Sequence, residues 1–160
     1  KSILLIGAGG AARGVLPSLL EEAPKSIVVA NRTIEKAKKI VEEFGSEAFQ
    51  TSKSSNLIAS GLSFENMKDF EFDIVINATS ISTDPSQNLN LDESIFRNTS
   101  LALDLYYSQA FTPFMDLADR AKVPIIIDGW GMLVEQAAES FFLWTGFRPD
   151  TSKLIEGHGE

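Results

Sequence analysis

The chain has 160 residues, a hydrophobic share of 44%, a charged share of 22% and a formal net charge of −8 at pH 7. This length suits one domain with a well-buried core and is too short for two of ordinary size, so we expect residues 1–160 to form a single domain. The negative charge argues against nucleic acid as a partner, because phosphate-backbone binding needs a basic face.

Membrane, disulfide and metal chemistry are also disfavoured by the composition. No apolar run approaches the roughly 18 residues that span a bilayer, and no export signal begins the chain, so we expect a cytoplasmic protein without a membrane partner. The chain has no cysteine, and its single histidine, His158, lies in a Gly-rich tail. Disulfides, thiolate nucleophiles, a metal site and a Ser-His-Asp triad are therefore not expected.

Short apolar runs alternate with helical patterns along the chain. The runs lack clean two-residue alternation, which is typical of parallel strands covered on both faces. This order predicts an α/β fold, a doubly wound parallel sheet of the Rossmann-like type with strand order 3-2-1-4-5-6. Strands are predicted at Ile3–Ile6, Ile27–Ala30, Ile74–Asn77, Leu101–Leu105 and Pro124–Ile127, with a weaker one near Glu47–Gln50.

Helices are predicted between these strands from apolar spacing and from end signals. The first contains Pro17, which should bend it or remove one hydrogen bond. The second has Thr33 as a plausible N-cap and should end at Gly45. Two more are expected, from Pro113 through Ala121 and over Met132–Thr145 before Gly146, and mobile loops are expected at Thr51–Gly61 and Asp84–Asn90.

A glycine-rich turn directly follows the first predicted strand and opens the first helix. Gly7, Gly9 and Ala12 fit the G-x-G-x-x-G/A pattern of a dinucleotide site. Gly7 permits the tight turn, Gly9 lets the backbone approach a pyrophosphate, and Ala12 allows close helix–strand packing. An ordinary glycine-rich turn is the alternative, but the strand-turn-helix context favours a phosphate cradle. Its predicted members are Gly7, Ala8, Gly9, Gly10, Ala11 and Ala12.

The end of the second predicted strand indicates which nucleotide is bound. NAD-binding domains usually place Asp or Glu here, about 20 residues past the glycines, whereas this chain has Asn31-Arg32-Thr33. A guanidinium pairs with a 2′-phosphate that a carboxylate would repel, and Lys36 can add charge one turn later. The alternatives are a solvated surface for Arg32 and Lys36 and a plain N-cap for Thr33. We predict NADP rather than NAD.

Taken together, the motifs resemble those of the NADP-binding, C-terminal domain of the shikimate dehydrogenase family. Besides the two nucleotide motifs, the chain carries Ile76-Asn-Ala-Thr-Ser80, Asp104-Leu-Tyr-Tyr107 followed by Thr112-Pro-Phe114, and Asp128-Gly-Trp-Gly-Met-Leu-Val-Glu-Gln-Ala137. The resemblance spans Ile3 to about Asp150, and the last motif is the most specific. Glutamyl-tRNA reductases and methylene-tetrahydrofolate dehydrogenases share the nucleotide fold but not this set in order.

The resemblance implies further site residues. Cofactor contacts are implied for Asn77, Ala78, Thr79, Ser80, Leu105, Gly129 and Met132, and substrate contacts for Tyr107 and Gln136. Simpler roles are open to several of them: Asn77 could satisfy backbone groups in a turn, Tyr107 could only pack, and Met132 could belong to the core. Gln136 differs, because a polar side chain on a largely apolar helix needs a partner.

Two positions depart from the family pattern. Ser82 stands where the family often has Gly, which affects the loop near the nicotinamide. Trp130 stands where the family commonly has Leu, which could reshape the substrate edge of the site.

The acid/base residues of a ketone reductase are not evident in this chain. Four residues after Tyr106 and Tyr107 come Ala110 and Phe111, so the Tyr-x-x-x-Lys pair of short-chain dehydrogenases is missing. In the family that the chain resembles, the catalytic Lys and Asp lie in an amino-terminal substrate domain. We therefore expect an excised domain with no catalytic residue of its own, which binds cofactor without turnover.

The implied parent enzyme reversibly reduces 3-dehydroshikimate to shikimate with NADPH in aromatic amino-acid biosynthesis. A quinate-using or bifunctional relative, or a non-catalytic NADP-sensing module of the same fold, would carry a nucleotide domain that looks the same. A Lys and Asp in substrate-site motifs upstream would favour the enzyme.

Four aromatic residues gather at the end of the last predicted helix: Phe141, Phe142, Trp144 and Phe147. An apolar patch of this kind favours self-association of the isolated domain. Sedimentation at high concentration should show dimers or larger species, and a strictly monomeric chain would contradict this expectation.

Overall fold

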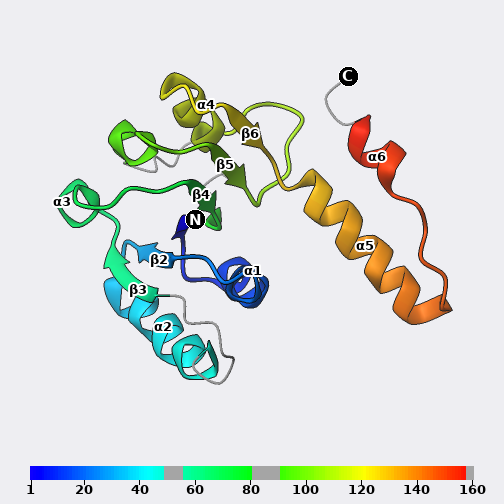
Figure 1. Cartoon of the computed structure of the whole chain (residues 1–160). Helices are drawn as coiled ribbons and strands as arrows, with labels where there is room; N and C mark the ends of the chain where they lie inside the picture. Colours follow the sequence, from blue (N-terminus) through cyan, green and yellow to red (C-terminus); the bar gives the residue numbers. More distant parts are fainter. Residues whose placement is uncertain (49–55, 81–90, 158–160) are drawn as a thin grey trace.

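The computed structural model describes residues 1–48, 56–80 and 91–157. Its centre is a six-stranded sheet in which every pair of neighbours is parallel, in the order β3-β2-β1-β4-β5-β6 (Figure 1). This confirms the predicted doubly wound topology and strand order. The strands are β1 Ser2–Ile6, β2 Ser26–Asn31, β3 Asn56–Gly61, β4 Ile74–Asn77, β5 Leu101–Asp104 and β6 Ile125–Ile127.

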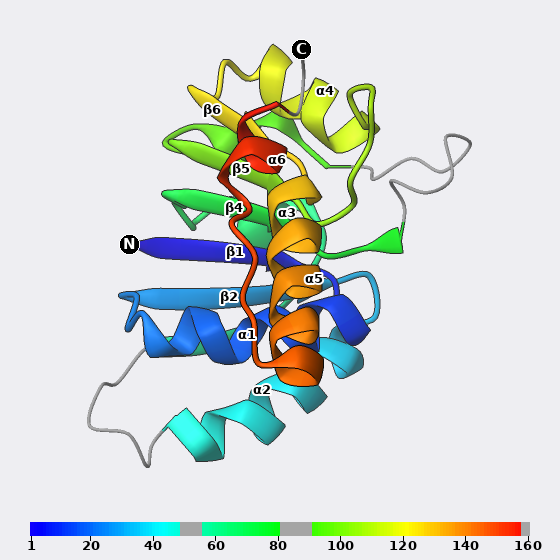
Figure 2. The ribbon, with the colours of Figure 1, turned by 90° about the vertical axis from the view of Figure 1, so that its right-hand side faces the viewer.

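Helices lie on both sides of this sheet (Figures 1 and 2). One side carries α1 and α2, and the other carries α3, the 3-10 helix η2 and α4. On the α1 side, α5 runs across the direction of the strands (Figure 2). After α5 the chain reverses direction and returns alongside this helix to α6. The helices are α1 Gly10–Glu21, α2 Ile34–Ala48, α3 Phe64–Met67, η2 Glu93–Phe96, α4 Pro113–Arg120, α5 Trp130–Thr145 and α6 Ser152–Glu156.

The central strands are buried on both faces, which explains why their sequences do not alternate. In β1, Leu4 and Ile6 pack into the core layer under α4, whereas Ile3 and Leu5 pack into the layer under α1 and α2. The α4 layer contains Phe114, which is fully buried and lies with its ring centroid 5.7 Å from that of Phe96. Apolar burial of this kind is the main stabilising contribution to such a fold.

The third strand and the end of the second helix differ from the prediction. No strand forms at Glu47, because α2 continues through Gly45 to Ala48, and Gln50 lies outside the described residues. A glycine inside a helix costs only about 1 kcal/mol relative to alanine, so it does not have to end one. The strand forms instead at Asn56–Gly61, within the predicted mobile loop, and pairs in parallel with all of β2.

Two helix-end signals, at the start of α4 and at the end of α5, are confirmed. The Thr112 hydroxyl accepts a hydrogen bond from the Met115 N–H at 3.2 Å, with Pro113 in the first turn of α4. Gly146 ends α5 in the left-handed conformation at φ 74°. The predicted loop at Asp84–Asn90 lies outside the described residues. Among the helices that the structure describes, none is both long enough and apolar enough to cross a membrane.

Candidate cofactor-binding site

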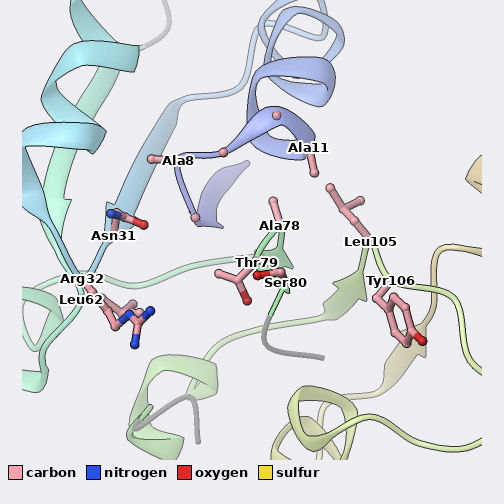
Figure 3. Close-up of a pocket in the computed structure, with 13 residues that line it drawn as sticks. Ala8, Ala11, Asn31, Arg32, Leu62, Ala78, Thr79, Ser80, Leu105 and Tyr106 are labelled. Atoms are coloured by element: carbon pink, nitrogen blue, oxygen red, sulfur yellow. The ribbon is translucent and has the colours of Figure 1, made fainter. Parts of the chain in front are cut away.

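A pocket of about 510 Å³ opens at the carboxyl ends of the parallel strands (Figure 3). It lies where the strand order reverses, between β1 and β4, which is the usual ligand site of an open α/β sheet. Arg32 and Leu62 line one end of it, and Leu105 and Tyr106 line the other (Figure 3). The lining residues are Gly7, Ala8, Gly9, Gly10, Ala11, Asn31, Arg32, Leu62, Ala78, Thr79, Ser80, Leu105 and Tyr106.

Gly7 is required by the fold itself. Its φ of +112° lies in a region that residues with a side chain rarely adopt, and an added Cβ would lie 2.8 Å from the Ala78 carbonyl oxygen. The Gly7 N–H donates to the Ala30 carbonyl at 2.8 Å, so the turn is held between the ends of β2 and β4. This glycine therefore sets the path of the chain into α1.

Gly9 and Gly10 have a different reason to lack side chains. A Cβ at either position would meet no protein atom within 4 Å, and both residues are exposed in the pocket wall. Gly9 precedes the first residue of α1, whose first-turn N–H groups have no partner within the helix. The open backbone and the positive end of the helix dipole together suit an anion. Ala12, predicted in the same cradle, is fully buried and packs in the core.

The turn after β2 brings Asn31 and Arg32 into the pocket. The Asn31 side-chain amide donates to the Thr33 carbonyl at 3.0 Å, and the Lys36 N–H donates to the same oxygen at 3.1 Å. These bonds shape the turn, from which Arg32 is exposed at the pocket edge. Thr33 and Lys36 are exposed beside it without lining it. Among the described lining residues there is no carboxylate, which suits a doubly charged phosphate.

Asn77 lies behind the pocket rather than in its wall. Its side chain is fully buried at the end of β4, and its Oδ1 accepts from the Thr79 N–H at 3.2 Å and from the Thr79 hydroxyl at 2.7 Å. Thr79 in turn lines the pocket together with Ala78 and Ser80. The predicted segment is thus brought to the site, with Asn77 as its internal support.

The opposite wall is the segment after β5. The Leu105 N–H donates to the Asn77 carbonyl at 2.9 Å, and the Tyr106 carbonyl accepts from the Gly129 N–H at 3.2 Å. Gly129 is buried against this segment, since an added Cβ would lie 2.7 Å from the Leu105 carbonyl carbon and closer still to its oxygen. Gly129 therefore supports the wall at Leu105 and Tyr106 without lining the pocket.

Comparison with known proteins identifies the family of this chain. A sequence model described as "Shikimate / quinate 5-dehydrogenase" matches residues 1–105, well over half of the chain. The chain belongs to the shikimate / quinate 5-dehydrogenase family. A second model, "Shikimate 5'-dehydrogenase C-terminal domain", matches residues 129–156, which contain α5 and α6.

Individual members of the shikimate / quinate 5-dehydrogenase family align over nearly the whole chain. Shikimate dehydrogenase (NADP(+)) of Nitrosospira multiformis is 44% identical over 155 residues, which are 97% of this chain and 53% of that protein. The Ael1 enzyme from Pseudomonas putida has a TM-score of 0.79 and 37% identity, covering 99% of this chain and 54% of that one. Shikimate 5-dehydrogenase from Thermus thermophilus, solved with NADP(H) and shikimate, has a TM-score of 0.74 and 32% identity, covering 96% and 52%. The chain thus spans about half the length of these relatives.

In this member of the shikimate / quinate dehydrogenase family, Tyr107 and Trp130 pack together outside the pocket. Their ring centroids are 5.4 Å apart, and the Trp130 indole N–H donates to the Leu154 carbonyl of α6 at 2.8 Å. Asp128 joins the same region, because its carboxylate accepts from the Ser108 and Trp130 N–H groups, both at 3.1 Å. The tryptophan that departs from the family pattern therefore links the loop after β5 to α6.

The segment around α6 is also held to α5 by charge. Arg148 donates to Glu135 at 2.8 Å and forms an ion pair with Glu139 one turn later. A hydrogen bond from the Thr151 hydroxyl, together with that from Arg148, lowers the pKa of the Glu135 carboxyl. Glu135 is therefore ionised at neutral pH, which keeps both bonds in place.

The remaining predicted residues lie on exposed parts of α5. Gln136 is exposed, so solvent can satisfy its side chain, and its contact with substrate stays a prediction. Met132 is 41% exposed and lines a second hollow with Trp130 and Ile155 rather than the pocket between β1 and β4. The four aromatic residues of the proposed association patch are all exposed, Trp144 at 82%.

Two lining residues, Leu62 and Tyr106, were not predicted. Leu62 directly follows β3, and the carboxyl ends of parallel strands meet at one edge of a sheet. Correct placement of β3 would have identified Leu62. Tyr106 lies between two predicted residues, Leu105 and Tyr107. Among the described residues no group of three or more His, Cys, Asp or Glu side chains could hold a metal ion.

Proposed function

We propose that residues 1–160 form one NADP(H)-binding domain of a cytoplasmic, NADPH-dependent shikimate dehydrogenase. The observation that carries the proposal is the pocket between β1 and β4, which joins an open helix N-terminus to Arg32 with no carboxylate among its described lining residues. The whole enzyme would reversibly reduce 3-dehydroshikimate to shikimate. The names of the relatives, which include NADP(+) enzymes and an NADP(H) complex, support this assignment.

The pocket residues divide by the part of the cofactor that each would hold. The backbone at Gly9 and Gly10 would bind the pyrophosphate, and Arg32 would pair with the 2′-phosphate, assisted by Thr33 and Lys36 from the start of α2. Thr79, Leu105 and the turn supported by Gly129 would border the nicotinamide, which supplies the hydride. Tyr107 and Gln136 would face the substrate.

Hydride transfer to a ketone also needs a proton donor. The described pocket lining offers no lysine, histidine or carboxylate for this role. We therefore propose that these 160 residues bind the cofactor without turnover. Shikimate-dependent reduction of NADP well above the blank would contradict this. A quinate dehydrogenase or an NADP-sensing module would bind the same cofactor in the same way, so the substrate range of the longer polypeptide distinguishes these alternatives.

Gly9→Ala tests cofactor binding separately from folding. Because a Cβ at Gly9 meets no protein atom within 4 Å, the fold should tolerate it, whereas it would occupy the space next to a bound pyrophosphate. We expect a loss of stability of at most about 1 kcal/mol, typical of a change at an N-cap, and an NADPH Kd raised about tenfold, which corresponds to ~1.4 kcal/mol. Fluorescence titration with NADPH measures the Kd.

Gly14→Ala is the matched control for this experiment. Gly14 is exposed in the middle of α1 with equally open space around its Cα, and it does not line the pocket. Its substitution should leave the Kd unchanged and stabilise the helix by roughly 0.5–1 kcal/mol. If Gly9→Ala bound NADPH as tightly as Gly14→Ala, the phosphate position proposed here would be wrong.

A further inference from the structure

A buried carboxylate lies directly behind the pocket and contacts both of its walls. Asp104, the last residue of β5, has no exposed surface. Its Oδ1 accepts from the Asn77 side-chain amide at 3.0 Å and from the Tyr106 N–H at 3.1 Å. Its Oδ2 accepts from the Thr112 hydroxyl at 2.7 Å. A carboxylate removed from water in this way is retained only when donors satisfy its oxygens.

The bonds that Oδ1 accepts from Asn77 and Tyr106 connect segments that are separate in the sequence. Through Asn77, Asp104 fixes which way the amide points, because the amide N–H₂ faces the carboxylate and leaves Oδ1 to hold Thr79. Through the Tyr106 N–H, it fixes the first turn of the opposite wall, where the Tyr106 carbonyl is held by Gly129. Thr79 and Tyr106 both line the pocket.

The bond at Oδ2 has a different role. Thr112 caps α4, which covers the far side of the sheet, and it does not line the pocket. Its hydroxyl donates to Asp104 and accepts from the Met115 N–H. Thr112 therefore anchors the carboxylate from behind, while Oδ1 serves the site. Substitutions at Thr112 and at Asp104 can therefore separate the effect of this network on folding from its effect on cofactor binding.

We propose that Asp104 is a positioning residue for the cofactor: it holds the Asn77–Thr79 wall and the Tyr106 wall in one fixed relation through a single oxygen. The proposal rests on the proposed function, since the pocket must be a cofactor site for the effect to be seen in binding. Asp104 itself touches no cofactor, because it is fully buried and lies outside the pocket lining.

The test compares Asp104→Ala, Asp104→Asn and Thr112→Val by NADPH titration and thermal unfolding. Asp104→Ala removes the acceptor of both walls and should raise the Kd about tenfold, in line with the loss of hydrogen bonds to a charged group. Asp104→Asn keeps one oxygen for Asn77 and Tyr106 and turns its amide toward Thr112, whose hydroxyl can accept. It should restore the Kd to within about threefold of the wild type.

Thr112→Val is the matched control for stability. It removes the donor at Oδ2 and the cap of α4, so it should lower the melting temperature while the Kd stays within about twofold of the wild type. If Thr112→Val weakened NADPH as much as Asp104→Ala, the effect would be general destabilisation and the proposal would be overturned. If Asp104→Asn were as weak as Asp104→Ala, charge rather than positioning would explain it.

Amide hydrogen exchange of the wild-type chain provides a second test, which needs neither bound cofactor nor a folded Asp104→Ala variant. Amide hydrogen exchange should show that the Thr79 and Tyr106 N–H groups open together, with a common protection factor, because one carboxylate holds both walls. Unrelated exchange rates at these two amides would overturn the proposal. Failure of the wild-type chain to bind NADPH, with coupled exchange intact, would instead overturn the proposed function alone.

Discussion

Gly129→Ala is expected to destabilise the chain by about 3 kcal/mol, because the added methyl group would clash with backbone atoms. Its Cβ would lie 2.7 Å from the Leu105 carbonyl carbon and 3.3 Å from that of Tyr106. These are backbone atoms of a segment whose N–H groups donate to the Asp104 carboxylate and to the Asn77 carbonyl, so they cannot rotate aside as a side chain can. Denaturant unfolding followed by circular dichroism measures the loss.

The same substitution should also affect the pocket. Relieving the contact requires Leu105 and Tyr106 to move away from α5, and both line the pocket. We therefore expect weaker NADPH binding in the molecules that remain folded. A variant that unfolded more easily yet bound NADPH normally would show that this wall does not reach the cofactor.

Gly131→Ala, in the first turn of the helix that Gly129 precedes, is the control for Gly129→Ala. A Cβ at Gly131 would lie 4.0 Å from a methyl carbon of Ile155, which is an ordinary contact. Alanine is also the better helix former, so this variant should be as stable as the wild type or more stable by up to ~1 kcal/mol. Equal losses in the two variants would mean that helix flexibility, rather than the contact with Leu105, explains the requirement for glycine.

The sequence was sufficient for the central sheet because its strands are buried on both faces. Runs such as Ile3–Ile6 and Ile27–Ala30 are apolar at every position. Such short, fully apolar runs are typical of strands covered on both faces of a parallel sheet. The edge strand β3 has no such signal. Its residues include Asn56, Ser60 and Gly61, and its stability comes from pairing with β2 rather than from its own propensity.

The residues of the candidate site were predictable from the sequence only where they belong to a short local motif. The glycine turn and Arg32 are local signals, and both line the pocket. The contacts of Asp104 are not local, since Asn77 is 27 residues away and no pattern in either segment names the other as partner. Gln136 shows the opposite case: its largely apolar helix suggested that the side chain needs a partner, but the residue is exposed and solvent can hydrogen-bond it.

Arg32→Ala should remove most of the preference for NADPH over NADH. In the wild-type chain we expect the phosphorylated cofactor to bind more tightly, because the two nucleotides differ only by the 2′-phosphate and Arg32 is the charged side chain lining that end of the pocket. The substitution should reduce the difference in binding free energy by ~1–3 kcal/mol, the contribution of a hydrogen bond to a charged group. Parallel fluorescence titrations with NADPH and NADH give both Kd values.

Two further variants separate the guanidinium from net charge. Arg97→Ala makes the same change in net charge at an exposed residue before β5, at the opposite edge of the sheet, and should leave the preference intact. Arg32→Lys keeps the charge but loses the planar fork, so it should retain only part of the preference. Added salt should reduce the difference between the NADPH and NADH affinities of the wild-type chain, because Arg32 is exposed and salt screens its attraction to the 2′-phosphate.

The outcome for NADH decides between two explanations of Arg32. If Arg32→Ala weakened NADPH and NADH equally, the residue would support the pocket rather than recognise the 2′-phosphate. The hydrogen bond from Asn31 to the Thr33 carbonyl shapes this turn without any contribution from the Arg32 side chain. The turn should therefore persist in the variant, and NADH should bind as it does to the wild type. Equal wild-type affinities for the two cofactors would contradict the assignment of NADP.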